Sequence, residues 1–90
     1  MFEEIEKTET GQIFINLFNI ENSATVDDIL NFYQNIKIKT IYINENKKGN
    51  YDLQFDSKEE AIKFISRGTG RINKRPFFMR ISQLLKFNLF

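Results

Sequence analysis

The amino-acid sequence predicts an α+β domain in which four strands and two helices follow one another in the order β-α-β-β-α-β. Three observations lead to this prediction. Four short segments alternate between two sets of side chains, two longer segments carry apolar residues at helical spacing, and each helical segment starts at a capping residue. With 90 residues the chain has the length of one domain that buries its own core.

The first strand is expected from Gln12 to Phe18, where side chains alternate between two faces. Its aliphatic residues should face the core. The opposite face then carries Phe14, Asn16 and Phe18. A helix is expected from about Val26 to Gln34, because Thr25 is suited to cap it and apolar side chains recur every three or four residues.

A second strand is expected from Ile38 to Asn44, a segment rich in β-branched residues in which Ile41 and Ile43 should point inward. The short polar turn after it predicts a hairpin with a third strand from Asn50 to Phe55. The outward positions on these two strands include Tyr42, Asn50 and Asp52.

The second helix should begin after Ser57, which forms a capping-box pattern with Glu60. Gly68 can end this helix in a left-handed conformation. The segment from Thr69 to Pro76 is expected to be a basic loop, and a last strand should run from Phe77 to Ser82. Its outward residues are Phe78 and Arg80.

This order of elements is that of the ferredoxin-like sandwich. Right-handed crossovers put both helices on one face of a four-stranded antiparallel sheet and leave the other face open, where we expect function. The domain should span residues 11–82. We expect residues 1–10 to be a flexible acidic lead-in, and the apolar tail 83–90 to form a short helix that could cover the sheet.

The amino-acid composition argues against several classes of function. The chain has neither cysteine nor histidine and no Ser-His-Asp set, so we expect no catalysis, no metal and no cofactor. No apolar run is long enough to cross a membrane. All 12 acidic residues lie within residues 1–60, whereas residues 61–90 carry seven basic residues and no acidic one. Such a basic segment is typical of a surface that binds a polyanion, although a solvated helix face and loop would look the same.

The stretch from Lys48 to Phe55 reads KGNYDLQF, with a basic residue and a glycine first and apolar residues at positions six and eight. It resembles the RNP1 octamer of RNA-recognition motifs (RRMs), and the resemblance extends over about residues 12–82. In that family aromatic residues at positions three and five stack on bases. Here those positions are Asn50 and Asp52, so the resemblance implies an atypical member.

The segment from Ile15 to Ile20 is similar to the RNP2 motif of the same family, and Thr25 follows at the spacing of its helix cap. In this register the stacking position is Asn16, and a shift by two residues places Phe14 there instead. Both residues share the open face in either register.

Two subgroups of the family offer different expectations. The segment from Phe32 to Ile43 resembles the helix-to-strand junction in translation initiation factors of the 4B and 4H type, which implies a helper of helicase-driven initiation with little RNA sequence preference. Quasi-RRMs of the heterogeneous-ribonucleoprotein F and H type also lack the aromatics. They read G-rich RNA through loops, and this is the lower-ranked alternative.

We therefore expect a monomeric, intracellular module, cytoplasmic or nuclear, that binds single-stranded RNA through the open sheet face with weak sequence preference. Its expected role is in translation or mRNA metabolism. The alternative is an RRM whose sheet or helix face binds a protein partner, or whose sheet is masked by the tail. The residues expected to bind RNA are Phe14, Asn16, Phe18, Tyr42, Lys48, Asn50, Asp52, Arg71, Lys74, Arg75, Phe78 and Arg80.

Overall fold

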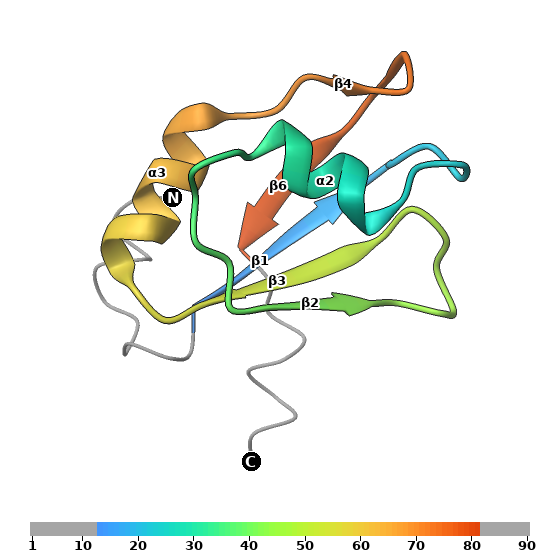
Figure 1. Ribbon diagram of the computed structural model, residues 1–90. Coiled ribbons are helices and arrows are strands. Elements are labelled where there is room, and N and C mark those ends of the chain that lie inside the picture. Colours follow the sequence, from blue (N-terminus) through green and yellow to red (C-terminus); the bar gives the residue numbers. More distant parts are fainter. Residues whose placement is uncertain (1–12, 82–90) are drawn as a thin grey trace.

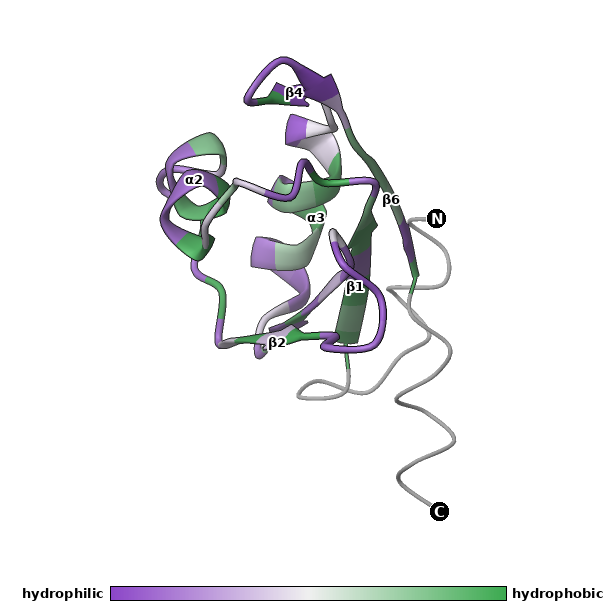
Figure 2. Ribbon diagram, turned by 90° about the vertical axis from the view of Figure 1, so that its right-hand side faces the viewer, coloured by the Kyte–Doolittle hydropathy of each residue, from purple (hydrophilic) through white to green (hydrophobic). Residues whose placement is uncertain are grey.

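The computed structural model describes residues 13–81, which form a four-stranded sheet with two helices on one side (Figures 1 and 2). The strands of the sheet are β1 (Ile13–Phe18), β2 (Thr40–Ile43), β3 (Tyr51–Phe55) and β6 (Phe78–Ile81), and the helices are α2 (Val26–Phe32) and α3 (Lys58–Arg67). The strands lie in the order β2-β3-β1-β6, and each neighbouring pair is antiparallel. The predicted fold class and element order are confirmed.

Both helices begin at the predicted capping residues. The Thr25 hydroxyl accepts from the Asp28 backbone N–H at 3.3 Å, and the Asp28 carboxylate accepts from the Thr25 N–H at 2.8 Å, which completes a capping box. The Ser57 hydroxyl accepts from the Glu60 N–H at 3.3 Å. Gly68 ends α3 with φ 76° and ψ −159°, a backbone region that is readily reached only by glycine.

The core lies between the sheet and the helices. The aliphatic side of β1 is fully buried there together with Leu53 and Phe55 of β3 and the aromatic ring of Phe64 from α3. Tyr33, directly after α2, stacks on Phe64 with ring centroids 3.9 Å apart, and its hydroxyl donates to the Gly68 carbonyl at 2.8 Å. Burial raises the pKa of Tyr33 well above its ordinary value, so this hydroxyl remains a neutral donor.

The β2–β3 turn packs closely against the loop after β1. The Ile20 N–H donates to the Gly49 carbonyl at 3.1 Å. Gly49 has φ +78°, and a Cβ at this position would collide with the carbonyl oxygen of Ile20. The glycine in the octamer is therefore required by the contact between these two loops.

Two local predictions were wrong. Ile43, predicted to point into the core, is 59% exposed, because it lies at the end of the edge strand β2, where residues 13–81 cover it only in part. The basic loop contains a hairpin of β4 (Arg71–Ile72) and β5 (Arg75–Pro76). The two residues between these strands, Asn73 and Lys74, have φ of 50° and 71°, as in the tight turns that match strand twist.

The expected lead-in at residues 1–10, the first and last residues of the expected domain and the expected tail helix at 83–90 lie outside the described residues. They remain predictions.

Candidate functional site

The outer face, defined as the sheet face opposite the helices, carries one row of side chains across all four strands. Strand register pairs Tyr42 with Asp52, Asp52 with Asn16, and Asn16 with Arg80. Strands are about 4.8 Å apart, so this central row extends roughly 14 Å from edge to edge. The row brings together four of the residues that the sequence analysis assigned to RNA.

A polar network joins the middle of this row. The side-chain amide of Asn16 donates to Asn50 Oδ1 at 2.6 Å, to the Tyr51 carbonyl at 3.1 Å and to Asp52 Oδ1 at 3.1 Å. Arg80 Nε donates to Asn16 Oδ1 at 3.1 Å. The polar network is the set Asn16, Asn50, Asp52 and Arg80. It includes both RNP1 stacking positions, and also the RNP2 stacking position in the register that assigns it to Asn16 rather than Phe14.

Two aromatic pairs accompany the central row. Tyr42 ends the row on the edge strand β2 and pairs with Phe14 at a ring-centroid distance of 6.3 Å, and Phe18 and Phe78 form the neighbouring row at 5.6 Å. The guanidinium carbon of Arg80 lies 4.7 Å from the centre of the Phe18 ring, a cation–π contact that fixes the arginine over the second pair.

Exposure decides which rings a ligand can reach. Phe14 lies on the outer face as predicted, yet it is only 8% exposed, whereas Tyr42 and Phe78 are 44% and 46% exposed. The difference follows from position, since β1 has a neighbour on each side and the two exposed rings stand on edge strands. Tyr42 and Phe78 are therefore the most accessible stacking surfaces. Phe18 is half-buried with Arg80 over its ring, and Phe14 supports Tyr42.

The polar centre is also closed to solvent. Asn16 is 4% and Asp52 is 8% exposed. The Asn16 amide reaches three acceptors with only two hydrogens, so at least one hydrogen is shared. We read these residues as a structural network that holds the strands and orients Arg80, rather than as freely available polar groups.

The hairpin cations, Arg71, Lys74 and Arg75, lie beside the loop that follows β1. Arg75 donates to Asn19 Oδ1 at 2.7 Å, and the Asn19 amide donates to the Pro76 carbonyl at 2.9 Å. Arg71 donates across the turn to the Lys74 carbonyl at 3.1 Å. All three side chains belong to exposed residues, so their charges face solvent on a hairpin that is held in place.

Strand register locates these charges relative to the aromatic rings. The pairing of Phe18 with Phe78 shows that the β4–β5 hairpin and the second aromatic pair share one end of the sheet. The turn that contains exposed Lys48 joins β2 to β3 at this same end, because Leu17 pairs with Tyr51. Lys48 and the hairpin cations thus lie at the same end of the sheet, next to the second aromatic pair.

The alternation of side chains along the strands was sufficient to place the predicted strand residues on the outer face, but the sequence analysis did not predict the polar network. Its only sequence signal was that three polar residues, Asn16, Asn50 and Asp52, share the face and replace aromatics together.

Within the described part of the chain, no cluster of acidic or thiol side chains is suited to hold a metal ion. No helix among residues 13–81 is long and apolar enough to cross a membrane.

No protein-family sequence model matches this chain, and no curated protein sequence does. Solved structures do match. The qRRM2 domain of Glorund is 19% identical with a TM-score of 0.69, and the match covers 86% of this chain and 96% of that one. The second RNA recognition motif of RNA-binding protein 19 is 17% identical with a TM-score of 0.73, covering 87% and 90% of the two chains.

Human G-rich RNA sequence binding factor 1 is 19% identical with a TM-score of 0.67, and that match covers 86% of this chain and 91% of that one. At such identities the likeness establishes the fold. The chain therefore has the fold of RNA-recognition motifs, as the octamer predicted, whereas nothing in these comparisons bears on the resemblance to the 4B and 4H type.

Proposed function

We propose that this chain is an RNA-binding module that takes single-stranded RNA on the outer face of its sheet. The observation that carries the proposal is the pair of exposed rings, Tyr42 and Phe78, at opposite edges of that face. Exposed aromatics on an RRM sheet offer surfaces on which unpaired bases stack. The names of similar structures, which include RNA recognition motifs and a G-rich RNA binding factor, support RNA as the ligand.

The proposal includes low affinity and weak sequence preference. Each base stacked on an aromatic ring contributes about 1–3 kcal/mol and is tolerant of sequence. Two rings are well exposed, while Asn16 and Asp52 at the centre of the face are nearly buried. Arg80 lies beside Phe78 in the strand and keeps donors that Asn16 does not use, so it can contact a phosphate or a base edge.

The hairpin cations and Lys48 would supply the electrostatic part of binding. They are exposed and lie at the end of the sheet that carries Phe78 and Arg80. Cations on this rim attract the phosphate backbone without reading sequence. Binding should therefore weaken steeply as salt rises.

We also propose that this module acts in translation initiation or other mRNA metabolism, in the cytoplasm or nucleus, as a monomer without enzymatic activity. This part of the proposal is supported by the resemblance of residues 32–43 and by the composition of the chain.

A second candidate function is protein binding by the same face. It is favoured by the low exposure of Phe14, Asn16 and Asp52, which leaves a closed centre and an apolar rim instead of an open row of rings. Coverage by the tail at residues 83–90 is the related possibility raised by the sequence. A gain of RNA affinity after deletion of residues 83–90 would identify the tail as a mask.

The test compares two rim variants with a matched control. Tyr42→Ala and Phe78→Ala should each weaken binding of a mixed-sequence single-stranded RNA by about 1–3 kcal/mol, read by fluorescence anisotropy. Leu30→Ala is the control, because Leu30 is 42% exposed but belongs to helix α2 on the other side of the sheet. If both rim variants bind as well as wild type, the outer face is not the RNA surface.

A further inference from the structure

The helix side of the domain contains a shallow groove that the RNA proposal does not use. The helix groove, of about 660 Å³, lies between the turn after α2 and the exposed side of α3. Its lining residues are Asn35, Ile36, Ile62, Lys63, Ser66 and Arg67. Because both helices cover the face opposite the outer face, a ligand here would not compete with RNA on the sheet.

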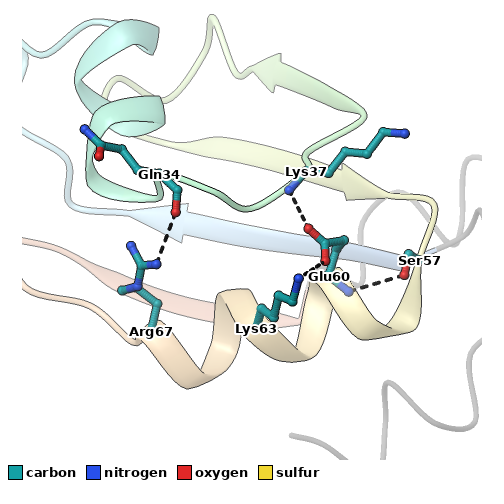
Figure 3. Close-up of polar contacts among 6 residues, drawn as sticks. All are labelled: Gln34, Lys37, Ser57, Glu60, Lys63 and Arg67. Carbon is teal, nitrogen blue, oxygen red and sulfur yellow. Dashed lines mark hydrogen bonds and ion pairs between the residues drawn. The ribbon is translucent and has the colours of Figure 1, made fainter.

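Hydrogen bonds at both ends of the groove link its two walls and fix the distance between them (Figure 3). At one end Arg67 donates to the carbonyls of Phe32 and Gln34, at 3.1 Å each. At the other end the Glu60 carboxylate accepts from the Lys37 backbone N–H at 2.8 Å. Glu60 and Arg67 are seven residues apart on α3, about 10 Å along its axis. The groove is therefore formed before any ligand binds.

The floor of the groove is aliphatic. Ile36 and Ile62 pack against the core while remaining only partly buried, so one side of each is left for the groove. None of the six lining residues is aromatic, so the groove has no ring on which a nucleobase could stack. An aliphatic floor favours an apolar side chain from a protein.

The lining of the groove includes two basic side chains, Lys63 and Arg67. Lys63 is paired with Glu60 at 2.7 Å, yet its side chain is 60% exposed and that of Glu60 only 17%, so the cation is the member that faces solvent. Arg67 donates its hydrogen bonds to neutral carbonyls, which do not neutralise its charge. No lining residue is acidic. A ligand that carries carboxylates matches these two side chains.

We propose that the helix groove binds a short acidic segment of a partner protein. An aliphatic or aromatic side chain of that segment rests on Ile36 and Ile62, and neighbouring carboxylates pair with Lys63 and Arg67. A preformed groove reduces the ordering cost of such binding, which is what a short segment needs. The domain would then join a protein on its helix side to RNA on its sheet side.

The experiment is an NMR titration of the whole chain with two synthetic peptide pools. Both pools carry a central Leu, Ile, Phe or Trp, flanked by Asp and Glu in one pool and by Lys and Arg in the other. The acidic pool should shift the backbone amides of Ile36, Ile62 and Ser66, and the basic pool should not. No shift at these amides with the acidic pool at millimolar concentration would overturn the proposal.

A matched pair of variants separates the effect of charge on peptide binding from the effect of side-chain size. Ser66 lines the groove and is exposed, so Ser66→Glu adds a negative charge that should weaken binding of the acidic pool by about tenfold or more. Ser66→Lys should bind at least as well as wild type. Equal affinity of the two variants would refute the assignment, as would single-stranded RNA shifting the same groove amides.

The tests of RNA binding by the outer face and of peptide binding by the helix groove are independent, so one proposal can fail without the other. RNA affinity of Ser66→Glu should equal that of wild type, because the change lies on the helix side. Loss of RNA binding in the rim variants would leave the groove result unaffected.

Discussion

Removal of the Asn16 side chain should destabilise the sheet far more than its small size suggests. Asn16→Ala eliminates two donated hydrogen bonds, since the amide has two hydrogens, and leaves the 8% exposed Asp52 carboxylate without that donor. Hydrogen bonds to charged groups contribute about 1.5–3 kcal/mol and neutral ones about 1 kcal/mol. Arg80 is exposed, so water replaces the bond it loses. The free energy of unfolding should therefore fall by about 3 kcal/mol.

The assay is urea denaturation followed by far-UV circular dichroism. Asn46→Ala is the matched control, because Asn46 lies in the exposed β2–β3 turn and donates to Asn44 Oδ1 through its backbone N–H, which alanine keeps. The control should change stability by less than about 0.5 kcal/mol. A double-mutant cycle with Asp52→Ala should give a coupling of about 1 kcal/mol or more between the two sites.

A loss for Asn16→Ala no larger than that of the control would refute the reasoning. The polar network would then be an incidental set of surface contacts, and Asp52 and Asn50 would be free to read bases. The same result would weaken the argument that Arg80 is oriented by Asn16.

Three further predictions concern the hairpin cations, two glycines and the contacts of Glu60 with Lys37 and Lys63. Alanine at all three hairpin cations should weaken RNA binding equally for all sequences and lower the slope of log affinity against log salt by about 2, and an unchanged slope would contradict the electrostatic role. Gly49→Ala should lower the thermal midpoint more than Gly68→Ala, because both glycines have positive φ but only the first would collide with Ile20; equal losses would contradict this. The pKa of Glu60 lies below the ordinary 4.5, first because of its hydrogen bond with Lys63, so its stabilising effect is full above that value and fades as pH falls. Glu60→Gln should therefore reduce stability at neutral pH and flatten its loss in acid, and parallel pH curves for variant and wild type would exclude this effect.

The sequence predicted on which face of the sheet the site residues lie, but not how exposed each side chain is. Alternation placed Phe14, Asn16 and Phe18 on the outer face, and strand pairing agrees with this placement. It could not show that Phe14 would be almost buried, nor that Ile43 would be exposed. Period two assigns a side chain to one face of a sheet, whereas exposure depends on which strand lies at an edge and on what covers it.

The polar network and the groove required contacts between distant segments. Asn16 meets Asn50 and Asp52 because β1 pairs with β3, and these residues are more than thirty positions apart. The β4–β5 hairpin shows the same limit on a smaller scale, since the sequence indicated only a basic loop there.

The sequence by itself determined the order of the elements, the caps at Thr25 and Ser57 and the faces of the strands, because each depends on local periodicity and on side chains that bond to nearby backbone groups. Only the tertiary structure decided which rings remain accessible and that Asn16 and Asp52 are buried at the centre of the sheet. It also decided that the contacts of Glu60 and Arg67 fix the walls of the helix groove. These features arise from strand order and from packing between segments far apart in the chain, which no local pattern encodes.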